Sequence, residues 1–273
     1  MKVVEHSSAA AFLDASEGYR TVDPVRTNLV GSIAQGVLDG RRYDAEHWFT
    51  VHDRREVVGA AVRTAPYSLV VGPMPRPAAE VLGDHLRERR QPMPGIKGPS
   101  EAVHVVAQRL GHPLQVTMRD VLRVLDRLVD PDPAPGAVRR AEAADAPVVR
   151  RWQEEFLVEA GLPVIVADDE SMPLMLQRTW LWWADDAPVA MAGHAPIVTT
   201  PGGTVGRIGP VYTVPSARRQ GIGAAVTAAV ARVLVDAGAT VMLYADAANA
   251  TSNGVYERLG FRAVDEHIEA NLL

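Results

Sequence analysis

The stretch of sequence that decides the fold is ARRQGIGAA, residues Ala217 to Ala225. It leads into a segment whose apolar residues recur at helical spacing, so we expect a helix to begin near Gly221. The first N–H groups of a helix have no partner inside it, and the helix dipole favours an anion beside them. Because Gly221 and Gly223 leave the backbone uncovered, the stretch predicts a binding site for a phosphate or pyrophosphate.

Two common phosphate-binding motifs fit this stretch poorly. A P-loop needs a lysine followed by Ser or Thr after its last glycine, and no such lysine is present here. A dinucleotide fingerprint needs a third small residue three positions after Gly223, where the sequence has Val226. Both interpretations are therefore weakened, although a nucleotide-dependent enzyme remains an alternative.

The length of the chain, 273 residues, suggests two domains. The boundary is predicted at PDPAPG, Pro131 to Gly136, because proline has no N–H and disfavours helix in the residue before it. We therefore expect an N-terminal domain over 1–130, an extended linker over 131–136 and a second domain over 137–273.

The composition excludes several classes of protein. With no cysteine, the chain has no disulfide, no thiolate zinc site and no cysteine nucleophile, and we expect no metal. The formal charge of -5 argues against a nucleic-acid partner. No apolar run is long enough for a membrane span, and the N-terminus lacks a basic region followed by a long hydrophobic stretch, so we expect a cytoplasmic protein.

The second half of the chain has the pattern of a mixed α/β (α+β type) domain with an antiparallel front half. Strands are expected over 137–140, 179–184, 189–197, 207–214, 241–245 and 261–272, and helices from 145, in the stretch after 170, from 221 to 237 and over 251–259. Gly202-Gly203 is expected to form the hairpin turn between two of the strands.

The glycine stretch resembles the pyrophosphate loop of the GNAT superfamily of N-acyltransferases, whose pattern maps onto Arg218 to Gly223. A second segment, Asn249 to Phe261, is similar to the family's pattern of an asparagine, small residues, a tyrosine and Gly-Phe. The resemblance covers the chain from Gly136 to its end. It implies the GNAT fold, in which a mixed central sheet is splayed open and flanked by helices.

The same resemblance implies roles for particular residues. Backbone groups of Val211 and Thr213 would bind the pantetheine arm of acetyl-CoA, and Asn249 and Ser252 would contact it from the other side. A backbone N–H near Thr213 would stabilise the oxyanion, while Tyr256 would protonate the departing thiolate. The pyrophosphate would be held by the loop residues Arg219, Gln220, Gly221, Ile222, Gly223 and Ala224, and Arg218 or Arg219 would reach a phosphate.

Each of these residues has a structural alternative. Tyr256 fits core packing, the two glycines fit a tight helix entry, Asn249 fits a helix cap and the arginines fit solvated charge. The general base stays open as well. The candidates are Glu154, Glu155, Asp168, Asp169, Glu170 and His194.

The first half of the chain has a related pattern. Three strands over 47–52, 56–63 and 68–71 precede a helix over 78–89, and a further helix ends in Arg109-Leu110-Gly111, much as Arg258-Leu259-Gly260 ends the other. This similarity suggests an internal duplication and two GNAT-like domains. Gly72-Pro73-Met74-Pro75 replaces the glycine-arginine loop and Ala107 replaces the tyrosine. We therefore expect a degenerate copy that does not bind CoA and instead shapes or covers the acceptor site.

These observations predict an N-acetyltransferase that transfers an acetyl group from acetyl-CoA to a primary amine of a small molecule or amino-acid-like compound by direct attack. We expect a monomer or a homodimer. The alternative is a CoA-sensing or regulatory module without turnover.

Overall fold

The computed structural model describes residues 1–90 and 93–273. The N-terminal half contains β1 (Lys2–His6), α1 (Ala9–Ala15), α2 (Glu17–Val22), α3 (Asn28–Leu38), β2 (Glu46–Asp53), β3 (Glu56–Thr64), β4 (Leu69–Val71), α4 (Arg76–Arg89), β5 (Gly95–Pro99), α5 (Ser100–Leu110) and β6 (Leu114–Leu125). The C-terminal half contains β7 (Ala137–Arg140), α6 (Ala146–Glu159), α7 (Met172–Leu176), β8 (Thr179–Ala184), β9 (Ala187–His194), β10 (Val198–Thr200), β11 (Gly203–Thr213), α8 (Ile222–Asp236), β12 (Thr240–Asp246), α9 (Ala250–Arg258) and β13 (Phe261–Leu272). The prediction of a mixed α/β fold with a splayed sheet and flanking helices is confirmed.

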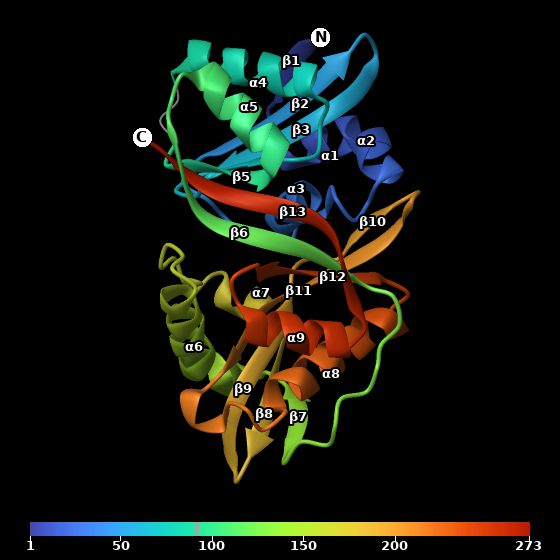
Figure 1. The fold of residues 1–273 in the computed structure, drawn as a ribbon, viewed down its shortest axis with the longest axis vertical. Coiled ribbons are helices and arrows are strands. Elements are labelled where there is room, and N and C mark those ends of the chain that lie inside the picture. The colour runs from blue at the N-terminus through green and yellow to red at the C-terminus, as the bar shows by residue number, and fades with distance from the viewer. Residues whose placement is uncertain (91–92) are drawn as a thin grey trace.

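The two halves share one hydrogen-bonded sheet, in the order β1-β2-β3-β4-β5-β13-β6-β12-β11-β9-β8-β7, with β10 paired to β11. The last strand of each half lies beside the other half: β13 separates β5 from β6, and β6 separates β13 from β12. Figure 1 shows β6 and β13 running side by side across the middle of the molecule. The N-terminal half has the strand order β1-β2-β3-β4-β5 followed by β13, and the C-terminal half has the order β7-β8-β9-β11-β12 followed by β6. The two orders correspond strand by strand, as an internal duplication would give. The duplication itself stays a prediction.

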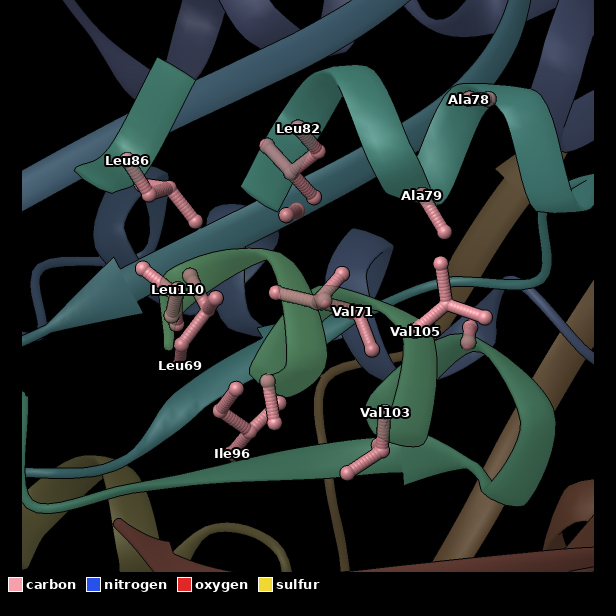
Figure 2. Packing of buried hydrophobic residues seen from close by; sticks show 14 of the residues in the cluster. Leu69, Val71, Ala78, Ala79, Leu82, Leu86, Ile96, Val103, Val105 and Leu110 are labelled. Atoms are coloured by element: carbon pink, nitrogen blue, oxygen red, sulfur yellow. The ribbon is translucent and has the colours of Figure 1, made fainter. Parts of the chain in front are cut away.

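The helices pack on the sheet through apolar faces, because their apolar residues recur at helical spacing and so lie on one side. In the N-terminal half, Leu82 and Leu86 of α4 and Val103 of α5 pack over β4 and β5 (Figure 2). Gly83 lets these two helices approach, because a Cβ there would lie 2.8 Å from the carbonyl oxygen of Val106. In the C-terminal half, α8 buries its apolar face against β9, β11 and β12. Among the described residues, no helix combines the length and apolar character that a membrane crossing needs.

The local structure differs from the sequence-based expectation at one strand. The sequence predicts a single strand over 189–197, but β9 ends at His194 and β10 begins only at Val198. Pro196 lies in the interruption, where it has no N–H to donate to a neighbouring strand. The segment between β6 and β7, which includes 131–136, contains no helix or strand, and the division of the chain at this linker stays a prediction.

Candidate active site

The sheet opens between β11 and β12. These parallel strands pair only from Val205/Thr240 to Ile208/Leu243. Beyond Ile208 the register of β11 against β9 shifts at Gly209-Pro210, and β11 continues to Thr213 paired with β9 alone. The ends of two neighbouring parallel strands are thereby separated, which leaves backbone groups on the inner edge of β11 without a strand partner.

Val211 and Thr213 present their backbone to this opening. Val214 donates its N–H to the carbonyl of Val189 at 3.0 Å. Because hydrogen-bonded pairs alternate along antiparallel strands, Tyr212 also faces β9, while Val211 and Thr213 face away from it. The backbone groups that the sequence singled out therefore lie on the open side. The carbonyl of Thr213 already accepts a hydrogen bond from Arg218 Nε at 2.9 Å.

The first turn of α8 lies beside the end of β11. Gly221, the residue before α8, has a φ of 79°, and Arg219 has a φ of 65°. A Cβ on Gly223 would lie 3.4 Å from Thr213 Oγ1, so the helix entry and the strand end are in contact. Within the described chain, no backbone N–H from Arg219 to Ala224 donates a hydrogen bond to the protein; the first that does is Ala225, to the carbonyl of Gly221 at 3.0 Å. Six donors therefore remain available at one helix N-terminus.

The two arginines of the loop differ in their contacts. Arg218 forms an ion pair with Glu159 at 2.8 Å, and its guanidinium lies 5.6 Å from the centre of the Tyr212 ring. It therefore connects α6 to the end of β11, and its charge is neutralised within the protein. Arg219 is exposed and has no ion pair with any residue that the structure describes.

Asn249 and Tyr256 lie at the two ends of α9. Asn249 caps the helix, because its side chain accepts the N–H of Ser252 at 3.0 Å. The structural alternative for Asn249 is thus present in the molecule, while Ser252 stands at the helix's first turn with its side chain half-buried. Tyr256 stacks edge-on against Phe261 at 6.1 Å and packs in the same apolar cluster as Val211 and Ala224.

Burial raises the pKa of Tyr256 to about 12, and the charge of Arg123 opposes this rise. The phenol therefore keeps its proton at neutral pH. Arg123 belongs to β6, so it comes from the N-terminal half. It donates to Asn253 at 3.0 Å and pairs with Glu257 at 3.0 Å, which fixes α9 to the neighbouring strand. No local pattern in the sequence indicates this contact, because Arg123 and Asn253 are 130 residues apart along the chain.

Two of the six candidate bases lie against β11. Glu155 lies near the hydroxyl of Tyr212, and burial together with this carboxylate raises the tyrosine's pKa to about 12. His194 pairs across the strands with Ile208, and its Nδ1 lies 2.7 Å from the carbonyl of Ala195. Burial lowers the pKa of His194, so its ring is neutral and Nε2 is left as an acceptor when Nδ1 carries the proton.

The other four candidates are exposed. Asp168 accepts hydrogen bonds from the backbone and side chain of Ser171, and Asp169 pairs with Arg150 at 2.6 Å. Glu154 and Glu170 are exposed on α6 and in the loop before α7. No hydrogen bond or ion pair joins any of the four to β11 in the described structure.

The corresponding region of the N-terminal half is built differently. At the start of α4, the cap residue Pro75 and the helical residue Pro77 supply no N–H, and the N–H groups of Ala78 and Ala79 already donate to the carbonyl of Pro75. The hydroxyl of Tyr19 donates to the carbonyl of Pro73 at 2.8 Å and lies where a side chain on Gly72 would be. This helix entry therefore offers an anion few donors.

Comparisons with known proteins agree with this geometry. Residues 191–269, which run from β9 into β13, match the family model of FR47-like proteins. The solved structures with a similar fold include a GNAT-family acetyltransferase from Colwellia psychrerythraea (11% identity, TM-score 0.61, 100% of both chains covered). They also include a GCN5-related N-acetyltransferase from Sphaerobacter thermophilus (18% identity, TM-score 0.60, 98% and 94% covered) and a tandem GNAT protein from the clavulanic acid biosynthesis pathway (13% identity, TM-score 0.60, 98% of both chains covered). A comparison with curated proteins finds no significant match.

The chain thus has the fold of the GNAT N-acetyltransferases, and its segment 191–269 matches the FR47-like family. The fold that the glycine loop and the Asn249–Phe261 segment implied by their resemblance is confirmed, while a degenerate N-terminal copy stays a prediction. The family match and the similar structures support the prediction of an acyl-CoA-dependent N-acetyltransferase.

Proposed function

We propose that the protein transfers an acetyl group from acetyl-CoA to the primary amine of a small molecule or an amino-acid-like compound. The observation that carries this proposal is the set of unpartnered N–H groups from Arg219 to Ala224 beside the opening between β11 and β12. A diphosphate fits such donors at a helix N-terminus. The free backbone of Val211 fits the amide-bearing arm that would follow it.

The residues around the opening can supply the remaining chemistry. Acetyl-CoA would bring an activated thioester to the site. The N–H of Thr213, directed into the opening, can donate to a developing oxyanion. The hydroxyl of Tyr256 holds a proton for the departing thiolate, and Glu155 or His194 can accept a proton from the amine, directly or through water.

The role proposed for the N-terminal half follows from the contrast between α4 and α8. At the entry of α4, two prolines have no N–H, and the N–H groups of Ala78 and Ala79 already donate to the carbonyl of Pro75. At the entry of α8, the N–H groups from Arg219 to Ala224 have no such acceptor in the described chain. We therefore assign coenzyme A binding to the C-terminal half alone. The N-terminal half contacts the C-terminal half where α3 meets β10, and we propose that it shapes or covers the acceptor site.

A single assay tests the proposed function. The full chain is incubated with acetyl-CoA and a panel of amines, while free thiol release and thermal stability are measured together. We expect stabilisation by CoA and amine-dependent thiol release. Stabilisation without turnover would favour a CoA-sensing module, and stabilisation by nucleotides alone would favour a nucleotide-dependent enzyme.

A further inference from the structure

Arg207 is a partly buried arginine that has no acidic partner among the described residues. It lies on β11, one residue before the last pair with β12, and its Nε is buried with no hydrogen-bond partner among the described residues. Its one side-chain hydrogen bond runs from an Nη to Ser32 Oγ on α3 at 3.3 Å. A guanidinium keeps its charge in proteins, so this position carries a positive charge that is partly withdrawn from water.

The groups that act electrostatically on Arg207 include no carboxylate. They are Tyr244, Arg41 and Tyr43. Burial lowers the pKa of Arg207; the charge of Arg41 adds to this decrease, and Tyr244 opposes it. The carboxylates that act on the neighbouring Tyr244 are already paired: Asp120 with Lys97 at 2.9 Å, and Asp265 with Arg26 at 2.8 Å.

A second arginine on the same side also lacks an acidic partner. Arg41, in the loop after α3, forms no ion pair within the described chain; it donates to the hydroxyl of Tyr67 at 3.1 Å and lies 4.9 Å from the centre of the Tyr43 ring. The exposed Arg41 and the partly buried Arg207 repel each other, and an anion bound beside both would relieve this repulsion.

Neutral hydrogen-bonding groups complete the surroundings. Asn28 is 1% exposed, and both polar atoms of its side chain are buried without a partner in the part of the chain that the structure describes. It lies one helical turn before Ser32, so the two share the face of α3 that contacts Arg207. The hydroxyl of Tyr244 is likewise buried and unpartnered. We call Arg207, Arg41, Asn28, Ser32 and Tyr244 the Arg207 cluster.

The Arg207 cluster adjoins the opening in the sheet. Tyr244 directly follows Leu243, the last residue of β12 that pairs with β11. Its neighbours in the apolar packing include Val25, so the segment before α3 covers this face. Figure 1 shows α3 and β10, which meet where Gly31 packs on Val198. Residues of both halves therefore contribute to the cluster, which lies next to the end of the pairing between β11 and β12.

We propose that the Arg207 cluster binds a carboxylate of the acceptor, so that the substrate is an amine that also carries a carboxylate. This inference rests on the proposed function. Arg207 and Val211 are four positions apart on β11, which is at most about 13 Å in extended strand, and the irregularity at Gly209-Pro210 shortens this distance. The arginine side chain spans part of that length. The spacing favours an acceptor whose amine and carboxylate are several bonds apart.

The test compares acceptors of matched length on the full chain. Thiol release from acetyl-CoA is measured with γ-aminobutyrate and ε-aminohexanoate against butylamine and hexylamine. We expect kcat/KM to be higher for the amino carboxylates by about thirtyfold or more. Arg207→Gln should abolish this preference while leaving the KM for acetyl-CoA unchanged, and Arg262→Gln, at an exposed ion pair on β13, should change nothing.

A binding measurement separates this inference from the proposed function. Glutarate is titrated calorimetrically into the protein without acetyl-CoA, and we expect binding that Arg207→Gln abolishes and Arg41→Gln, in an exposed loop, weakens severalfold. Glutarate binding without turnover of any amine would refute the acetyltransferase and leave the anion site standing. No glutarate binding to the unmodified protein, or an unchanged preference for amino carboxylates in both variants, would overturn the inference.

Discussion

Gly221 is the residue on which the anion-binding loop depends most. Its φ of 79° lies in the left-handed region, and the nearest atom to an added Cβ would be Ala134 Cβ at 3.8 Å. The requirement for glycine is thus one of backbone conformation and not of space. The sequence indicated this position, because glycine adopts left-handed backbone angles without strain and here stands directly before a predicted helix.

Gly221→Ala should therefore lower the free energy of unfolding by about 1–2 kcal/mol and weaken CoA binding. Gly238→Ala is the matched control, since Gly238 also has a left-handed φ, 75°, and has no neighbouring atom within 4 Å. Denaturant unfolding and calorimetric CoA titration of both variants check this. Equal loss of CoA affinity in the two variants would show that the effect arises from general destabilisation.

Tyr256 is the residue to which we assign the proton donor. Tyr256→Phe should lower kcat by about 10- to 100-fold, because it removes the donor and keeps the ring packed on Phe261. The Kd for CoA should stay within about twofold. Tyr19→Phe, in the N-terminal half, is the control and should keep full activity. If Tyr256→Phe loses CoA binding and turnover together, the tyrosine is structural.

His267 gives the stability of the chain a dependence on pH. Burial lowers its pKa from 6.5 to about 4, and the ring is 2% exposed and lies 5.0 Å from that of Tyr244. The unfolded chain therefore binds this proton at a higher pH than the folded chain. The stability that the neutral ring contributes is complete above pH 6.5 and is lost as the pH falls through 4.

We expect this loss to amount to about 3 kcal/mol. His267→Gln should flatten the curve of unfolding free energy between pH 6.5 and 4, and urea titrations at closely spaced pH values measure it. A variant with the same slope as the unmodified protein would assign the acid sensitivity to other groups.

At the scale of elements, local sequence signals were enough to predict the helices α8 and α9. Both helices follow residues with an evident role at an N-terminus, Gly221 and Asn249, and both end within two residues of a glycine. The strands β8 and β13 follow the alternation and β-prone composition of their sequences. These elements depend mostly on neighbours along the chain, which is why the sequence predicted them.

The exchange of β6 and β13 could not be predicted in this way. Each strand has its partners in the other half, and register between distant strands leaves no local pattern. For the same reason the sequence analysis did not identify Arg123 as a support of α9 or Arg207 as a partly buried cation that contacts α3. The candidate site was therefore predictable where it is made of one loop and one helix entry, and unpredictable where two halves meet.

At the scale of the whole molecule, the shared sheet predicts that the halves do not fold alone. Residues 1–130 expressed by themselves would lack β13 between β5 and β6, which leaves two unpaired strand edges inside a core. We expect this fragment to show no cooperative thermal transition by circular dichroism, and co-expression with 131–273 to restore one. A cooperative transition of the fragment alone would contradict the prediction.

The central claim is that the N–H groups between Arg219 and Ala224 receive the diphosphate of coenzyme A. A crystal structure of the protein with CoA tests it most directly. The account predicts diphosphate oxygens within about 3 Å of these nitrogens, with the pantetheine arm between β11 and β12. A diphosphate bound elsewhere, at α4 or on the open surface, would contradict it.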